Sequence, residues 1–148
     1  MMIQDDGDFH SSAFILGPDY TTALIRDMRK TNPLSKFAGG KKQLIKPFGK
    51  KLRGETPLET LIREIYEETG LRVRKNQTKY VTTGNMGNHN KHYFFCRIPS
   101  FRKLVPLSKE YEEARVVSVD DLVWLPDFHP NYRSIFLQHI QPLLAEEN

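Results

Sequence analysis

The chain has 148 residues, of which 39% are hydrophobic and 27% charged, with a net charge of +4 and a pI of about 9.2. This mixture excludes an intrinsically disordered chain, no run approaches the roughly 18 consecutive apolar residues of a membrane span, and the length predicts one domain over residues 1–148. The positive charge favours anionic partners, from phosphorylated metabolites to nucleic acid, without choosing among them.

The single cysteine, Cys96, has no partner for an internal disulfide, and it lies in an apolar run that favours a buried thiol. The first ten residues contain no basic region followed by an apolar stretch. We therefore expect a reducing, cytoplasmic compartment and no membrane association.

Short runs rich in apolar and β-branched residues alternate with turn residues along most of the chain, which predicts strands. The expected strands, in chain order, are residues 11–17, 21–28, 43–49, 71–75, 78–84, 91–98 and 114–119. A Pro18-Asp19 turn suits a hairpin between the first two strands, and residues 31–42 and 84–90 are expected to be loops.

One helix is signalled clearly at both ends. Thr56 suits the N-cap, Pro57 the first helical position, and Glu59 completes a Thr-x-x-Glu capping box. Gly70 suits the C-terminal cap. The helix is expected to span residues 57–69.

Further along the chain, residues 119–122 are expected to open a short helical turn, and residues 131–140 carry apolar side chains close to helical spacing. A mixed sheet with two principal helices follows, which is an α/β or α+β sandwich.

The apolar face of the 57–69 helix covers an arc of about 100°. It consists of Leu58, Leu61, Ile62 and Ile65. Glu64, Glu67 and Glu68 form a second arc that adjoins this face, so we expect them at the rim of the core and partly dehydrated. Like charges at this spacing repel, and the repulsion is less screened beside apolar surface. A compensating cation is expected, and hard carboxylate oxygens suit Mg²⁺ or Mn²⁺.

These glutamates belong to a longer pattern, G-x5-E-x7-R-E-I-x-E-E-x-G-L, which runs from Gly49 to Leu71. The pattern resembles the Nudix box of the Nudix hydrolase family, and all nine specified positions match with their spacing. The resemblance implies an α/β/α sandwich that uses Mg²⁺ or Mn²⁺ to hydrolyse a pyrophosphate bond in a nucleoside diphosphate linked to another moiety, X.

Carried over residue by residue, the resemblance makes Glu67 and Glu68 metal ligands and Glu64 either a further ligand or the base that activates water. Arg63 would orient that carboxylate. Gly49, Glu55 and Gly70 would have structural roles in the motif.

Two positions depart from the common pattern of the family. Phe48 stands where many relatives have glycine, although its backbone carbonyl can still contribute to a metal site. Many members also carry a further acidic ligand just before a later strand. Glu110, Glu112 and Glu113 compete for that role, and the spacing from residues 114–119 favours Glu110.

Substrate-binding candidates lie in two segments. Lys50, Lys51 and Arg53 precede the helix within a basic stretch and are placed to neutralise phosphates, unless they form only a solvated loop. Trp124 and Asp127 loosely resemble residues that some Nudix members use to hold a purine base by stacking and hydrogen bonding. Core packing of Trp124 and turn capping by Asp127 are the alternative interpretations.

Three functions are compatible with these features. The leading hypothesis is a Mg²⁺-dependent pyrophosphohydrolase acting on a small nucleotide, with a homodimer allowed. The second is a non-catalytic nucleotide-binding or sensing module that keeps the box as a scaffold. The third is an RNA 5′-pyrophosphohydrolase, which ranks lower because the sequence carries no second RNA-binding module.

Overall fold

The computed structural model describes residues 5, 7–27, 44–85, 87–105 and 111–146, without the side chains of residues 26, 27, 44, 45 and 111–113. The strands in this part of the chain are β1 (Phe9–Gly17), β2 (Thr21–Asp27), β3 (Leu44–Ile45), β4 (Phe48–Lys50), β5 (Thr78–Asn85), β6 (Asn90–Arg97) and β7 (Tyr111–Ser118). The helical segments are α1 (Pro57–Thr69), η2 (Lys75–Gln77), α2 (Val119–Leu122), α3 (Pro130–Ile135), η3 (Phe136–Ile140) and α4 (Gln141–Glu146).

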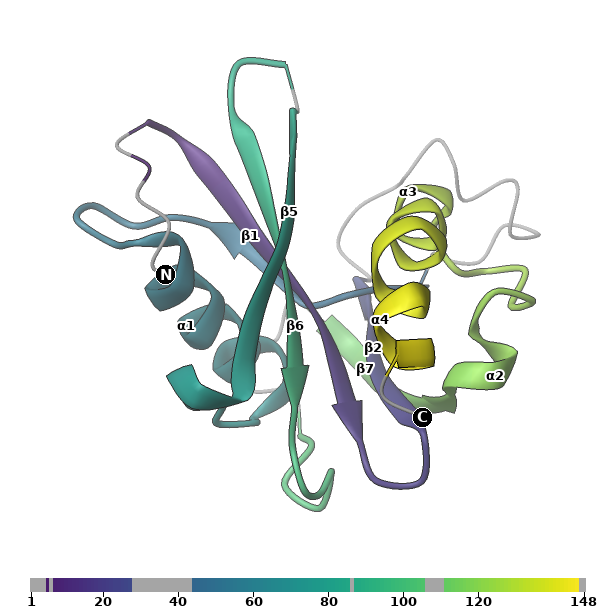
Figure 1. Ribbon diagram of the computed structural model, residues 1–148. Helices are drawn as coiled ribbons and strands as arrows, with labels where there is room; N and C mark the ends of the chain where they lie inside the picture. Colours follow the sequence, from purple (N-terminus) through teal and green to yellow (C-terminus); the bar gives the residue numbers. More distant parts are fainter. Residues whose placement is uncertain (1–4, 6, 28–43, 86, 106–110, 147–148) are drawn as a thin grey trace.

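The strands form one mixed sheet in the order β3-β2-β1-β6-β5, with β4 paired to β1 and β7 paired to β2. The β1–β6 pair is parallel and the other pairs are antiparallel. Helix α1 covers one face of this sheet, and the segment from α3 to α4 covers the other (Figure 1). The predicted α/β/α sandwich with a mixed sheet is confirmed.

Two separate cores fill the space between these layers, because successive side chains of β1 point to opposite faces. Phe14 packs in the core beneath α3 and η3, and Ile15 packs in the core beneath α1. Side chains of β6 also point alternately into the two cores, and every residue from 91 to 96 is buried. β6 lies between β1 and β5, and both of its faces are covered.

Helix α1 has the predicted bounds and caps. The Thr56 side chain accepts from the Glu59 N–H at 3.2 Å, and the Glu59 carboxylate accepts from the Thr56 N–H at 2.9 Å. Gly70 ends the helix with φ 74°, a left-handed conformation that favours glycine. Leu61 and Ile65 are fully buried beneath the helix, as the apolar arc predicts.

Two predicted strands differ from the structure. Residues 71–75 form no strand: Leu71 and Val73 are buried under α1, so their alternating pattern reflects packing without a strand partner. The expected strand 43–49 is divided into β3 and β4, because Lys46 and Pro47 interrupt it and Pro47 has no N–H to donate.

The other predicted elements agree closely with the structure, including α2 and a C-terminal helical segment that extends from Pro130 to Glu146. The expected 31–42 loop lies outside the described residues. None of the described helices is both long and apolar enough to cross a bilayer.

Lys46 differs from the solvated basic stretch in which the sequence places it. Its side chain is fully buried, its Nζ donates to the Thr22 hydroxyl, and it lies 4.6 Å from the centroid of the Phe14 ring. Burial holds the pKa of this ammonium well below its usual value. Lys46 therefore belongs to the interior and adds nothing to a basic surface.

Candidate active site

Arg63, in the middle of α1, connects the predicted acidic residues. Its Nε and Nη2 donate to Glu55 at 2.8 and 2.9 Å, and its Nη1 donates to Glu64 at 2.7 Å and to Glu67 at 3.2 Å. Nη2 also donates to the Lys50 carbonyl at 2.9 Å, which ties the helix to β4. The hydrogen bond from Arg63 is the main cause that lowers the pKa of Glu55, and Glu55 in turn raises the pKa of Arg63. The guanidinium thus holds the carboxylates in fixed positions, as the motif predicts.

Glu64 lies directly against Gly49 of β4. A Cβ atom at position 49 would fall 2.0 Å from Glu64 Cδ and 2.3 Å from Oε2, so only glycine allows this approach. The Glu64 side chain is 15% exposed, and burial raises its pKa despite the hydrogen bond from Arg63. Gly49 therefore has a specific task, which is to admit the carboxylate of Glu64.

Glu68 is the most deeply buried of the three glutamates, with 1% of its surface exposed. Its Oε2 accepts from the Phe48 N–H at 2.9 Å, so the residue that departs from the family pattern positions this carboxylate through its backbone. Glu67 is different, because its side chain is 49% exposed. The expected partial dehydration holds for Glu64, is exceeded at Glu68 and is weakest at Glu67.

The chemistry of these side chains fits a hard divalent cation, since carboxylate oxygens on successive turns of a rigid helix are the ligands that Mg²⁺ and Mn²⁺ prefer. In the part of the chain that the structure describes, no three His, Cys, Asp or Glu side chains converge on one point, and Arg63 stands between Glu64 and Glu67. Glu67 and Glu68 would be the ligands of such an ion, with Glu64 as a further candidate, once Arg63 released Glu64 and Glu67.

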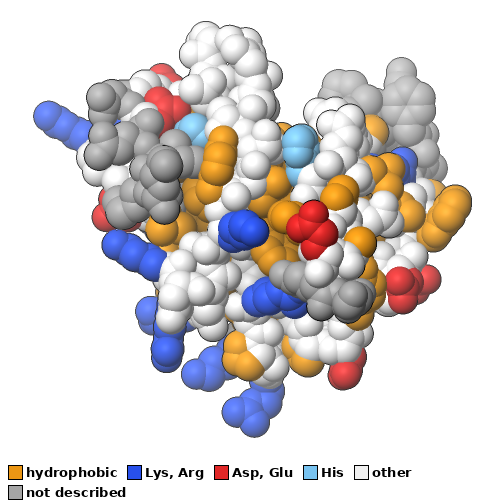
Figure 2. Space-filling view, in the orientation of Figure 1, with side chains coloured by type: hydrophobic (Ala, Val, Ile, Leu, Met, Phe, Trp, Pro, Cys, Tyr) orange, Lys and Arg blue, Asp and Glu red, His pale blue; other side chains and the backbone are white. Residues whose placement is uncertain are grey.

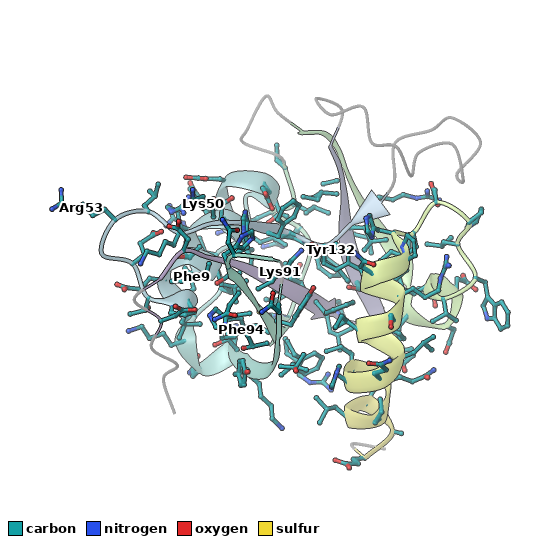
Figure 3. All side chains as sticks on the ribbon, turned by 90° about the horizontal axis from the view of Figure 1, so that it is seen from above. Phe9, Lys50, Arg53, Lys91, Phe94 and Tyr132 are labelled. Carbon is teal, nitrogen blue, oxygen red and sulfur yellow. The ribbon has the colours of Figure 1, made fainter. Side chains whose placement is uncertain are left out.

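A second group of residues, which the sequence analysis did not identify, borders the acidic face. Lys91 of β6 is 6% exposed, its Nζ donates to the Tyr132 hydroxyl, and it lies 4.5 Å from the centroid of the Phe48 ring. Tyr132 comes from α3, so this contact joins the sheet to the C-terminal helices (Figure 3). Figure 2 shows this face of the molecule notched between the β5–β6 hairpin and α3, with hydrophobic side chains in the notch.

Burial is the main cause that lowers the pKa of Lys91, to about 7, and the Glu68 carboxylate partly opposes it. Lys91 in turn contributes to the lowered pKa of His129, after the larger effect of burial. The Lys91 amine therefore lies against the Phe48 and Tyr132 rings and close to Glu68.

The pKa of Lys91 predicts how its replacement changes stability with pH. Between about pH 7 and 10.5 the unfolded chain keeps the lysine proton that the folded chain has lost, so the free energy of unfolding rises with pH. The Lys91→Met variant lacks the titrating amine, so its free energy of unfolding should not rise in this way. From pH 7 to 9 in urea unfolding, the wild type should gain about 1 kcal/mol per pH unit relative to the variant. Lys79→Met, at an exposed lysine of β5, is the control, and parallel pH profiles for wild type and Lys91→Met would contradict the assignment.

The three predicted substrate-binding residues, two lysines and one arginine, have different surroundings in the structure. Lys50 is exposed at the end of β4, where its carbonyl meets Arg63. Lys51 lies 5.2 Å from the centroid of the Phe9 ring. Arg53 is exposed and extends away from the body of the molecule in Figure 3. The backbone of Lys50 thus reaches the acidic face through Arg63, whereas Lys51 lies against Phe9 and Arg53 extends away from the face.

The predicted base-binding pair, Trp124 and Asp127, comes from the segment that follows α2. Trp124 follows α2, is 81% exposed, and α2 lies on the other side of the sheet from α1 (Figure 1). Asp127 is partly buried in the segment between α2 and α3. The structure does not bring Trp124 to the acidic face, and Trp124 is not packed in the core either. Glu110 lies outside the described residues, as do the side chains of Glu112 and Glu113.

Comparisons with known proteins agree with this geometry. The family model described as the NUDIX domain matches residues 12–139. A comparison with curated protein sequences found no match.

Solved structures with this fold include a candidate Nudix hydrolase from Chromobacterium violaceum, with 26% identity, a TM-score of 0.60 and coverage of 90% of this chain and 76% of that one. A MutT protein from Methanosarcina mazei has 19% identity and a TM-score of 0.68, covering 88% of this chain and 90% of that one. A structure from work on MutT of Aliivibrio salmonicida and Vibrio cholerae has 13% identity and a TM-score of 0.69, covering 94% and 98%. With a family model that spans most of its length and this fold, the chain belongs to the Nudix hydrolase family, whose members hydrolyse acid anhydride bonds in nucleoside diphosphates linked to a further moiety, X.

Proposed function

We propose that the chain hydrolyses a pyrophosphate bond in a small nucleotide, with Mg²⁺ or Mn²⁺ as cofactor, at the acidic face of α1. The observation that supports this most directly is the set of carboxylates that Arg63 and β4 hold together at one edge of the core. Glu55, Glu64, Glu67 and Glu68 carry more negative charge than Arg63 neutralises, and a bound divalent cation would offset the excess beside the apolar surface.

Each residue of the face has a distinct role in this proposal. Bound Mg²⁺ or Mn²⁺ would neutralise charge on the phosphate oxygens and align the attacking water. Glu67 and Glu68 hold it, with Glu68 kept in place by the Phe48 N–H. Arg63 orients Glu64, and Glu55 fixes Arg63. Glu110 remains the proposed downstream ligand.

Glu64 is either the base that takes a proton from water or a third ligand. Burial raises its pKa, which makes its carboxylate a stronger proton acceptor than an exposed one. Its position against Gly49 keeps it at the boundary between the helix and β4. Both roles require an ionised carboxylate, so in either case activity should fall as Glu64 becomes protonated at low pH.

The substrate is proposed to lie across the edge of α1 toward Phe48 and Lys91. Lys50 and Lys51 would adjoin the phosphate end in this arrangement, and the partly exposed Phe48 ring offers flat apolar surface to a base. Arg53, Trp124 and Asp127 would contact the substrate only if their surroundings rearrange.

A panel of nucleoside triphosphates, nucleoside diphosphate sugars and dinucleoside polyphosphates, incubated with Mg²⁺ and resolved by anion-exchange chromatography, tests the proposal. The expected result is release of a mononucleotide, phosphate or pyrophosphate from at least one compound, and none in EDTA. A shift in melting temperature with a ligand, but no product from any compound, would instead identify a binding or sensing module. Turnover confined to 5′-triphosphate RNA would identify an RNA 5′-pyrophosphohydrolase.

The proposal extends to the setting of the enzyme. Cys96 is buried and its pKa is raised to about 12, so the thiol is unreactive and compatible with the reducing cytoplasm expected from the sequence. A single domain over residues 1–148 and an optional homodimer remain predictions.

A further inference from the structure

A second charged region lies away from the acidic face. Residues 71–105 contain eight lysines and arginines and no aspartate or glutamate, although the whole chain has 18 acidic residues. Lys91 is buried in the notch, and the other seven are exposed. A stretch this long without acidic residues is not expected for a face that is merely solvated, because such faces usually mix both signs of charge.

The fold gathers five of these side chains beside α1. Lys79 is not among them, because it pairs with Phe95 in β6 and so points to the α3–α4 side of the sheet. The Val105 N–H donates to the Thr69 carbonyl at 2.8 Å, so the segment that follows β6 returns to the C-terminal end of α1. Figure 2 shows lysine and arginine side chains along the lower-left flank of the molecule, where β5 begins and β6 ends. The basic face consists of Arg72, Arg74, Lys75, Arg102 and Lys103.

The basic face is distinct from the acidic face. The Arg72 guanidinium lies 4.2 Å from the centroid of the Tyr66 ring. At 100° per residue, Tyr66 points about 160° away from Glu64 around α1. Glu64 and the contact between Arg72 and Tyr66 therefore lie on opposite sides of α1.

Few acidic groups neutralise the basic face. Among the described residues, Arg72 and Arg74 form no ion pair within 4.0 Å. Hydrogen bonds with Thr56 lower the pKa of Glu59, and the nearby Lys75 adds to this effect. The positive electrostatic potential of the basic face can therefore attract an anionic partner.

We propose that the basic face binds the phosphodiester backbone of single-stranded nucleic acid. Two aromatic side chains lie on the same side of the sheet as these charges: Tyr80, 39% exposed and in contact with Phe94, and Tyr66 beneath Arg72. Aromatic rings and cations on one surface suit bases that are free to stack, which duplex DNA does not offer. A nucleic acid bound here is held outside the acidic face, so this site does not depend on the proposed catalytic activity.

Binding should be measured by fluorescence anisotropy with a labelled 20-nucleotide oligo(U) that has a 5′-hydroxyl and hence no pyrophosphate bond to cleave. With five contacts, log K should fall with log[salt] at a slope of about −3.5, so affinity should decrease about a hundred-fold from 50 to 200 mM salt. The variant Arg72→Gln/Arg74→Gln/Lys75→Gln should reduce the slope to about −1.4. Arg115→Gln, an exposed position on β7, is the control and should bind like the wild type.

Further arms distinguish the ligand. Equal binding of oligo(dT) supports a site for the backbone shared by RNA and DNA, and weaker binding of oligo(dT) assigns the site to RNA. No binding at 50 mM salt, an unchanged slope in the triple variant, or binding to phosphatidylserine vesicles without binding to oligonucleotides would overturn the proposal. The triple variant should hydrolyse the small nucleotide substrate at the wild-type rate. Failure of the nucleic-acid proposal is thereby distinguished from failure of the proposed function.

Discussion

Glu68→Gln is expected to lower kcat/KM for nucleotide hydrolysis by roughly 1000-fold, with little change in the fold. The amide keeps the size of the side chain and an oxygen that can accept from the Phe48 N–H. It replaces the other carboxylate oxygen with an NH₂ group, which cannot bind a cation. Steady-state kinetics with saturating Mg²⁺ and urea unfolding of the same preparation would measure both quantities.

Glu59→Gln is the matched control. It removes the same charge from the same helix, and glutamine can still complete the capping box. This variant should retain the activity of the wild type. If Glu68→Gln also turned over normally, the acidic face of α1 would not be the catalytic site.

Gly49→Ala should produce the second large loss, of about 100-fold in kcat, although it adds only one methyl group. The new Cβ would lie 2.0 Å from Glu64 Cδ, so the carboxylate must leave its position and its 2.7 Å hydrogen bond with Arg63. The clash involves a side chain and no backbone atom of α1, so the helix itself should remain folded. The effect should therefore appear more in kcat than in KM.

Gly84→Ala provides the comparison for this experiment. A Cβ at position 84 in β5 would meet its nearest neighbour, a ring carbon of Tyr93, at 3.5 Å, which is ordinary contact. Its kcat should match that of the wild type. Full activity in Gly49→Ala, with the Arg63–Glu64 contact intact in a crystal structure, would show that the position of Glu64 does not matter.

The catalytic helix is predictable from the sequence because its signals are local. The capping box of Thr56 and Glu59 and the left-handed Gly70 depend on neighbouring residues only, and all three are found as predicted. The motif from Gly49 to Leu71 covers both β4 and α1, so it specifies the contact between them as well.

Features that depend on tertiary contacts could not be predicted in this way. Leu71 and Val73 alternate as a strand does, yet they pack under α1 with no neighbouring strand. Lys46 and Lys91 are lysines like any other in the sequence, and only the packing of β1, β6 and α3 buries them. The signal that could have identified Lys91 is its place at the start of the apolar run in β6.

The position of Trp124 also depends on tertiary structure. A single tryptophan near an aspartate favours a base-binding pair by analogy, but its position depends on the path of the chain between α2 and α3. The structure leaves it 81% exposed after α2. A site residue outside the contiguous motif needs the fold before it can be assigned.

We claim that the acidic face of α1 binds a divalent cation. This binding can be measured without substrate by titrating the protein with Mn²⁺ and following free Mn²⁺ by electron paramagnetic resonance. Mn²⁺ should bind the wild type and Glu59→Gln with the same affinity, and Glu68→Gln at least about 10-fold more weakly. Equal Mn²⁺ affinity in all three proteins, or no binding to the wild type, would contradict the claim.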